Sequence, residues 1–288
     1  MRSLLILACS FPAVAYAQAN NAIGITVELV QASPLEGDAG PEEPPELGYA
    51  NIRANLLVPI RLEDWDAVLL PGASYRLYRP QFDDQITTEN PRELHDINLQ
   101  FGLLKRFGDT WSLLLSGGAG IATDFENVEG DHFRYQGIGL FRYGNGESWT
   151  FGLGVAFSYW FGEPQLFPSF QLLYHGDRWN ADLTLPRIAS VRYTVSDRFD
   201  VGFLGQLDGN RFSLGDDLPF ESASLSIADA GMVVGVRIKG PIWFTAYGGV
   251  TLLRRLEFLD DQNNELLNLD QDPGPIFRLG VVIRPDRP

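Results

Sequence analysis

The sequence predicts an all-β fold, a transmembrane antiparallel up-and-down β-barrel of fourteen strands, with twelve strands as the alternative. Apolar and polar residues alternate with period two over many segments. Short and long polar connections alternate between those segments, and an aromatic residue follows most of the short ones. In a membrane barrel the apolar face of each strand points outward to lipid and the polar face points inward, the inverse of a soluble barrel.

The N-terminus has the features of a cleaved secretory signal peptide. Arg2 is a short positive region, residues 4–14 are apolar, and Ala15-Tyr16-Ala17 is a small-residue cleavage motif. The predicted domains are therefore a signal peptide, residues 1–17, and an outer-membrane barrel, residues 18–288. Cleavage there removes Cys9 and leaves a mature chain without a disulfide framework or a thiol nucleophile. A lipoprotein signal ending at Cys9 is the competing interpretation, but its apolar run is too short.

Period-two alternation is clearest in residues 149–161 and 133–143. In the first segment aromatic and aliphatic side chains occupy the odd positions, while most even positions are glycine, alanine, serine or threonine. In the second segment Phe133, Tyr135, Phe141 and Tyr143 share one face, and Arg134 shares the other with Arg142. A strand needs about 9–11 residues to cross a bilayer, and most of the predicted strands reach that length.

The connections alternate in length. Short ones fall near residues 63–64, 108–109, 144–146, 176–177, 196–197 and 239–241, and long polar ones at 33–48, 79–91, 125–130, 213–222 and 257–274. Outer-membrane barrels have short periplasmic turns and longer outer loops. The aromatic residues after the short turns therefore predict a girdle at the periplasmic interface, where an indole buries its ring and keeps its N–H hydrated. The predicted girdle residues are Trp65, Trp111, Trp149, Trp179, Phe199 and Trp243.

The predicted strands begin near residues 23, 49, 65, 92, 110, 131, 149, 167, 179, 187, 199, 225, 241 and 275. Residues 167–195 are the region that leaves the count open. If one long strand runs through Pro186 rather than turning there, the first strand must leave the barrel, and twelve strands remain.

Alternation also predicts which charged residues face the interior of the barrel. The predicted lumen-lining residues are Arg53, Arg76, Asp96, Arg106, Arg134, Arg142, Arg192, Arg237 and Arg278. Asp200 and Asp208 share this face. Two interpretations remain open: an arginine-lined lumen that favours anions in a pore, or arginine–carboxylate pairs that brace a closed barrel.

Composition excludes one class of partner and marks no catalytic centre. A formal net charge of −15 argues against nucleic-acid binding. No cofactor or metal-binding motif is present. The acidic outer loops contain clustered carboxylates but lack the spacing of a dedicated Ca²⁺ site, so we interpret them as solvated. His95 with Asp96, or His132 with Asp131, is a candidate for a hydrolase at the outer rim, although no motif marks a nucleophile.

The chain resembles bacterial outer-membrane β-barrels. More narrowly, Trp179, Leu185-Pro186 and Val191-Arg192-Tyr193 resemble a family of such barrels known only as a domain of unknown function. The resemblance implies the fold and a Gram-negative outer membrane, but no substrate. The chain departs from the usual pattern at its end, since it finishes in "VVIRPDRP" and its last aromatic residue is Phe277 rather than a terminal one.

These observations lead to three hypotheses about function. The first is a narrow porin-like channel for small polar or anionic solutes, without enzymatic activity. The second is a closed structural barrel that binds a partner through its acidic outer loops, and the third is a rim hydrolase. The expected partners are outer-membrane lipid, the barrel-assembly machinery and small solutes.

Overall fold

A computed structural model describes residues 23–36, 46–82, 93–125, 132–144, 148–159, 161, 163–215, 220–260, 262 and 264–284. The predicted signal peptide, with Cys9, lies outside the described residues. The strands are β1 (Ile23–Glu36), β2 (Glu46–Leu57), β3 (Ile60–Leu62), β4 (Ala67–Phe82), β5 (Leu94–Phe107), β6 (Trp111–Thr123), β7 (Phe133–Gly144), β8 (Trp149–Ser158), β9 (Gln165–His175), β10 (Trp179–Leu185), β11 (Ile188–Ser196), β12 (Phe199–Ser213), β13 (Ser222–Lys239), β14 (Ile242–Leu259), β15 (Glu265–Gln271) and β16 (Pro275–Ile283).

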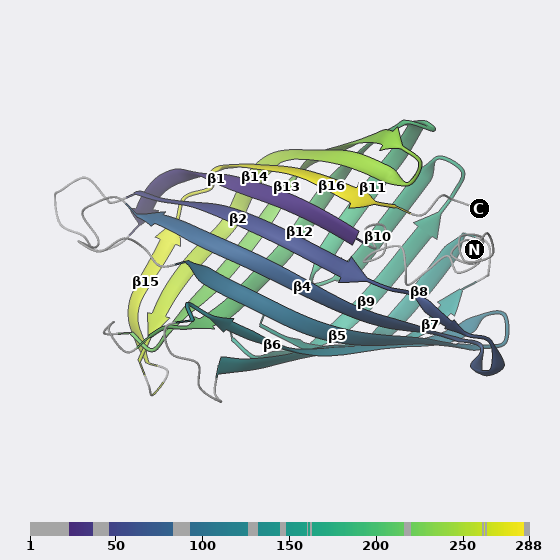
Figure 1. Ribbon diagram of the computed structural model, residues 1–288, viewed down its shortest axis with the longest axis horizontal. Helices are drawn as coiled ribbons and strands as arrows, with labels where there is room; N and C mark the ends of the chain where they lie inside the picture. Colours follow the sequence, from purple (N-terminus) through teal and green to yellow (C-terminus); the bar gives the residue numbers. More distant parts are fainter. Residues whose placement is uncertain are drawn as a thin grey trace.

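The strands form one antiparallel sheet that closes on itself, a transmembrane β-barrel of the predicted class (Figure 1). From β4 to β14, each strand pairs with the next in sequence. β16 then pairs with β14 on one side and with β1 on the other, and β2 links β1 to β4. The described sheet has sixteen strands. The two that the sequence did not predict are β3, a three-residue hairpin partner of β4, and β15, which pairs with the ends of β14 and β1.

Pro186 lies in a turn between two strands and not within one long strand. β10 and β11 pair as a hairpin from Trp179↔Tyr193 to Thr184↔Ile188. β1 pairs over most of its length with β2 and with β16. Both features differ from the alternative with a single strand through Pro186 and β1 outside the barrel.

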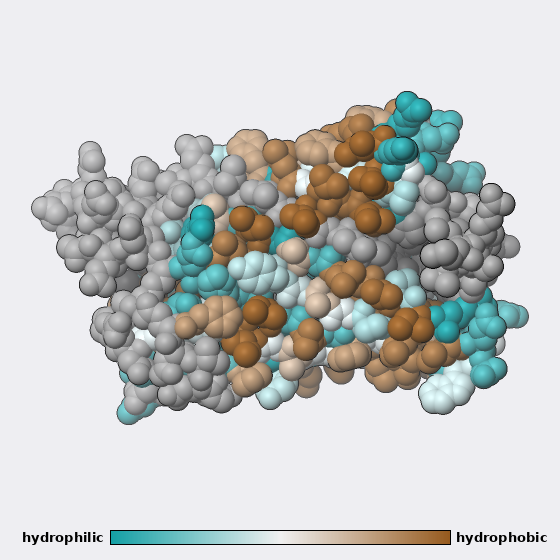
Figure 2. Space-filling model, in the orientation of Figure 1, coloured by the Kyte–Doolittle hydropathy of each residue, from teal (hydrophilic) through white to brown (hydrophobic). Residues whose placement is uncertain are grey.

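The wall has the inverse arrangement expected of a membrane barrel. Side chains at alternate positions of the described strands are apolar and exposed on the outside, and Figure 2 shows them gathered across the middle of the visible face. Examples on separate strands are Ile52, Leu99, Leu115, Leu153, Val191, Phe203, Met232, Leu252 and Leu279. In water this surface would be a large unfavourable apolar area, whereas in a bilayer it faces hydrocarbon. None of the helices in the described part of the chain is long and apolar enough to span a membrane.

The two ends of the barrel differ, and we name them by their chain connections. The terminal end carries the start of β1, the end of β16 and the described short turns, and the distal end carries the last residues of β1, β4, β6 and β12 (Figure 1). At the terminal end, Gly108 turns the chain from β5 into β6 with a φ of +67°, a value that glycine adopts without steric cost. Before β4 the chain forms a short 3-10 helix, Glu63–Trp65, and Asp66 takes a left-handed conformation.

Candidate functional site

Ion pairs cross the inside of the barrel at mid-height. Asp208 of β12 contacts the guanidinium of Arg53 on β2, and its Oδ2 lies 2.9 Å from Nη2 of Arg76 on β4. On the ring, β13, β14, β16 and β1 separate β12 from β2, so these contacts join strands that are not neighbours in the wall. Asp96 of β5 also faces inward and accepts a hydrogen bond from the Asn98 amide.

Two further arginine–carboxylate groups lie toward the terminal end. Arg278 donates to Asp229 through both terminal nitrogens, at 3.0 and 2.5 Å, and the Tyr247 hydroxyl donates to the same carboxylate. Arg284 donates to Asp200 at 2.5 Å, with Arg192 at 3.8 Å from the other carboxylate oxygen. Four of the eight predicted interior arginines, Arg53, Arg76, Arg192 and Arg278, are thus within 4 Å of a carboxylate. This arrangement agrees with the second interpretation of the sequence, in which arginine–carboxylate pairs brace the barrel from inside.

The distal half of β12 bends across the interior onto β6 and β7. Ser213 pairs in parallel with Thr123, and Arg134 donates to the Ser213 hydroxyl at 2.8 Å and to the Arg211 carbonyl at 3.3 Å. The Gly215 amide then donates to Asp124 at 3.0 Å. These contacts divide the distal interior in two.

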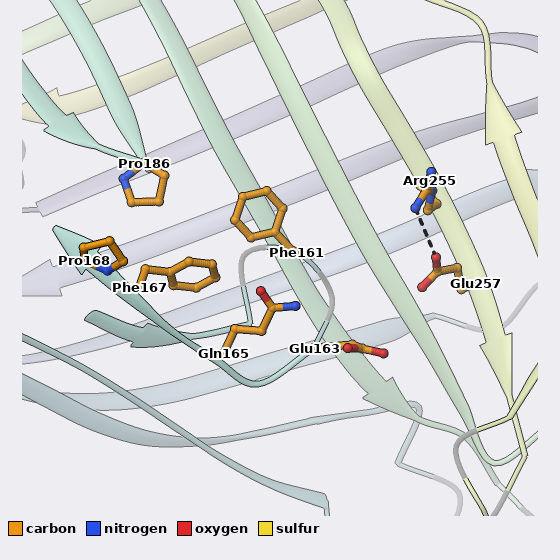
Figure 3. A pocket seen from close by; sticks show the side chains of 8 residues that line it. All are labelled: Phe161, Glu163, Gln165, Phe167, Pro168, Pro186, Arg255 and Glu257. Carbon is orange, nitrogen blue, oxygen red and sulfur yellow. Dashed lines mark ion pairs between the residues drawn. The ribbon is translucent and has the colours of Figure 1, made fainter. Parts of the chain in front are cut away.

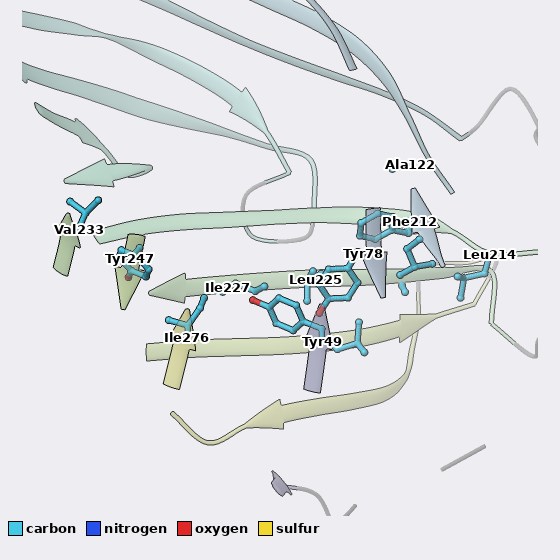
Figure 4. Packing of buried hydrophobic residues seen from close by; sticks show 13 residues of the cluster. Tyr49, Tyr78, Ala122, Phe212, Leu214, Leu225, Ile227, Val233, Tyr247 and Ile276 are labelled. Carbon is cyan, nitrogen blue, oxygen red and sulfur yellow. The ribbon is translucent and has the colours of Figure 1, made fainter. Parts of the chain in front are cut away.

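One of the two compartments is filled by a buried apolar cluster. Its largest members come from β2, β4, β12, β13, β14 and β16 and form one buried cluster (Figure 4): Tyr49, Tyr78, Phe212, Leu225, Ile227, Tyr247, Leu256 and Ile276. The rings of Tyr49 and Tyr78 lie 4.7 Å apart between centroids. Sequence reasoning missed this cluster, although its residues hold the inward parity of their strands. Pattern alone does not show that β12 bends inward to close the compartment.

The remaining predicted lumen residues are Arg106, Arg142 and Arg237. Arg142 is 1% exposed, and its guanidinium has no hydrogen-bond acceptor among the described residues, although Asp182 of β10 acts on its charge. Arg237 lies over the Trp243 ring at 5.0 Å. Arg106 lies at the terminal end of β5, where its backbone amide donates to the backbone carbonyl of Asp66 at 3.0 Å.

Exposed aromatic residues ring the terminal end. Trp65, Trp111, Trp149, Trp179 and Phe199 are all at least one-third exposed. Three of them pack in tilted contact against a tyrosine of the neighbouring strand that sequence reasoning missed, with centroid distances of 4.9 Å for Trp111–Tyr143, 4.6 Å for Trp149–Tyr174 and 4.8 Å for Trp179–Tyr193. Each pair is directly cross-strand. The signal in the sequence was that each tryptophan lies two or three residues after a short turn and each tyrosine one to three residues before another short turn.

Trp243 differs from the predicted girdle. It is 7% exposed and lies inside the barrel between the guanidiniums of Arg237 and Arg284, at 5.0 and 4.9 Å. Its neighbours Ile242 and Phe244 take the outward positions of β14, and successive strand residues face opposite sides. The turn-then-tryptophan pattern placed Trp243 at the right height but on the wrong face.

Tryptophan fluorescence should separate these two environments. In single-tryptophan variants refolded into bilayers, lipids brominated on the acyl chain near the headgroup should quench Trp111 or Trp149 strongly and Trp243 weakly, because only the first two contact lipid. Quenching of Trp243 as strong as that of Trp149 would contradict its inward position.

The β10–β11 hairpin is short, and a pocket lies above it. β10 pairs with β9 only from Phe170 to His175, and β11 pairs with β12 only up to Gln206. Beyond these pairs the wall gives way to a cavity of about 600 Å³ (Figure 3). The residues that line it are Phe161, Glu163, Gln165, Phe167, Pro168, Pro186, Arg255 and Glu257. No single stretch of sequence predicts this pocket, because its walls come from residues between β8 and β9, from β9, from the β10–β11 turn and from β14.

One of the two candidate catalytic pairs, His95 with Asp96, lies on opposite faces of β5. His95 Nδ1 lies 2.9 Å from the Tyr75 hydroxyl, on the outer face of β5, whereas Asp96 points inward. Asp131, the predicted partner of His132, lies outside the described residues. Within the described residues, no three His, Cys, Asp or Glu side chains are placed to hold a metal ion. Of the acidic loops, residues 37–45 also lie outside the described residues, and Asp260 accepts hydrogen bonds within its own turn from Gln262 and Asn264.

Comparison with known proteins gives a family and several distant structural neighbours. The model of a domain of unknown function, DUF6268, matches residues 70–283. The COG4313 outer membrane channel from Pseudomonas putida F1 is similar with a TM-score of 0.49 at 11% identity, over 91% of this chain and 95% of that one. The Pseudomonas putida toluene transporter TodX is similar with a TM-score of 0.37 at 9% identity, over 93% and 92%. No curated protein sequence matches. At these TM-scores the neighbours carry no argument about substrate.

Proposed function

The chain belongs to the DUF6268 family, whose domain has no assigned function, and from its geometry we propose that it is a narrow outer-membrane channel for small polar solutes. The observation that carries the proposal is the charged interior inside an apolar exterior. Arg53 and Asp208 are 33% and 19% exposed although they lie inside the barrel, so water-accessible space remains beside the mid-height ion pairs. Removing charges from water is costly, and a water-filled passage avoids part of that cost.

The location follows from the same arrangement. We place the terminal end on the periplasmic side, because short turns and both chain ends are found there in outer-membrane barrels. The predicted signal peptide would direct secretion, the barrel-assembly machinery would insert the chain, and the aromatic ring would sit among the lipid headgroups.

The path we propose runs on the β5–β11 side of β12. The apolar cluster fills the other distal compartment, whereas Asp96, Asn98 and Gln100 of β5 are partly exposed toward the first. The distal pocket above Pro186 lies over this side, at the outer mouth. A path confined in this way passes only small solutes.

The charges support polar selectivity more strongly than anion selectivity. Arg53, Arg76, Arg192 and Arg278 all have carboxylate neighbours within 4 Å, so their fields are largely cancelled. Arg53 is the candidate for an anion contact, because its side chain is 33% exposed, the most of these four, whereas Arg142 is 1% exposed.

Solute flux into liposomes tests the proposal. The refolded barrel should admit small neutral polar solutes and exclude larger ones. Arg53→Gln should lower the flux of small anions about tenfold relative to neutral solutes, the effect of about 1.4 kcal/mol lost from one charge-assisted contact. Arg79→Gln is the matched control. Arg79 forms an exposed ion pair with Glu93 on the rim, so its loss should change neither the anion flux nor the neutral flux.

The second candidate function is a closed barrel that acts through its acidic outer loops. The apolar cluster and the contacts of β12 with β6 and β7 favour it, because they close much of the distal end. A folded barrel that admits no solute in the flux experiment would leave this second function in place of the channel.

A further inference from the structure

The distal pocket has two chemically different walls. Phe161, Phe167, Pro168 and Pro186 form an apolar wall on the β8–β11 side, and Arg255 and Glu257 face them from β14 (Figure 3). Its volume of about 600 Å³ is within the range of small-molecule sites, roughly 300–1,000 Å³. A ligand that fills it therefore has an apolar body and a polar end.

The charged residues of the polar wall determine whether the polar end of such a ligand should be positive or negative. Arg255 is already compensated, since its Nε donates to Asp270 at 2.7 Å and its Nη1 lies 3.5 Å from Glu257. Arg211 donates to the Ser222 hydroxyl at 3.0 Å and interacts with Glu163. Glu265 adds a fourth acid beside Glu257. Four carboxylates, those of Glu163, Glu257, Glu265 and Asp270, thus face the two guanidinium groups of Arg211 and Arg255.

Glu257 is half-buried at the polar wall. Glu257 lies at the distal end of β14, where that strand pairs with β15. This position is past Leu253, the last exposed large apolar residue of β14, and so is outside the membrane-spanning part of the strand. Burial raises the pKa of Glu257; the Arg255 guanidinium opposes that shift, and the Glu265 and Glu163 carboxylates add to it. A cation placed between Glu257 and Glu163 would relieve the repulsion, since an ionised carboxylate is an acceptor only.

We propose that this pocket binds small amphipathic cations, in which an aromatic or branched apolar body carries an ammonium group. The apolar body lies against Phe161, Phe167 and the two prolines, and the ammonium group lies between Glu163 and Glu257. The two phenylalanine rings attract a cation further through their π-faces. Binding there does not require that the barrel conduct, so the site stands whether or not the proposed channel does.

Three ligands of the same shape test the charge. 2-Phenylethylammonium, 2-phenylethanol and phenylacetate share one apolar body and differ in the charge of the polar end. Their dissociation constants are measured by calorimetry on the folded full-length mature barrel in a neutral detergent. The ammonium compound should bind at least tenfold more tightly than the alcohol, and phenylacetate should bind most weakly. Phenylacetate binding as tightly as the ammonium compound would overturn the proposal.

Variants locate the site. Glu257→Gln and Glu163→Gln should each weaken the ammonium compound about fivefold and leave the alcohol unchanged. Phe167→Ala should weaken both. Glu163 is exposed, so its variant keeps the test valid if Glu257→Gln fails to fold. Glu93→Gln, on the rim and outside the pocket, is the control. Equal ammonium affinity in the Glu163→Gln variant and the unchanged chain would contradict the assigned site.

Discussion

Replacing Asp208 with asparagine should destabilise the barrel by about 3 kcal/mol, the lower end of the cost of breaking a buried ion pair from one side. Asp208 is the shared partner of Arg53 and Arg76. Arg76 is only 7% exposed, so its guanidinium cannot regain water when the carboxylate is lost. Arg53 is a third exposed, which is why the lower end of the range applies. Urea unfolding of the refolded barrel in detergent, followed by the change in gel mobility, measures the difference.

Two controls make the result specific to the brace. Arg53→Gln should cost about 1 kcal/mol, because water reaches that side of the pair. Arg79→Gln should cost almost nothing, because Arg79 and Glu93 are 55% and 44% exposed. If Asp208→Asn were as stable as the unchanged chain, the ion pairs would not hold β12 to β2 and β4.

Replacing Gly154 with alanine should destabilise the barrel by about 3 kcal/mol or prevent folding. A Cβ at Gly154 would lie 1.8 Å from the carbonyl oxygen of Gly139 and 2.9 Å from the Leu140 Cα. Both are backbone atoms of the paired strand β7, so no side-chain rotation can remove the clash, and overpacking of this kind costs up to about 3 kcal/mol.

Gly117→Ala is the matched control for the Gly154 variant. Gly117 also lies within a strand, but the nearest atom to its Cβ would be 3.6 Å away, an ordinary contact. Alanine there should leave stability unchanged or slightly higher, since glycine weakens a strand interior. Folding yield and urea midpoint compare the two variants directly, and equal stability would mean that β7 and β8 are not so closely paired.

The inner and outer faces of the barrel wall could be predicted from the sequence, because successive side chains of a strand point to opposite sides of the sheet. Arg53, Arg134 and Arg142 point inward, and Leu99, Leu115 and Leu153 point outward, as alternation requires. The positions of the turns followed from the same pattern. Alternation does not specify which residues meet across the interior. The contacts of Asp208 and the inward bend of β12 depend on strands far apart in sequence, and nothing local encodes them.

The two local errors have local causes. Trp243 and Phe244 are adjacent, so only one of them can face lipid, and the turn pattern did not reveal which one. A register shift between Arg237 and Lys239 accompanies the inward position of Trp243. The short strands β3 and β15 were missed because they extend the hairpins at the two ends and add no complete crossing of the membrane.

Single-channel conductance of the refolded mature chain in a planar lipid bilayer tests the central claim most directly. A narrow channel predicts small discrete current steps, a weak charge preference because the interior arginines are paired, and a larger step in the Arg134→Ala variant, in which the contact between β7 and β12 is lost. A barrel shown to be folded and inserted that never conducts would contradict the claim.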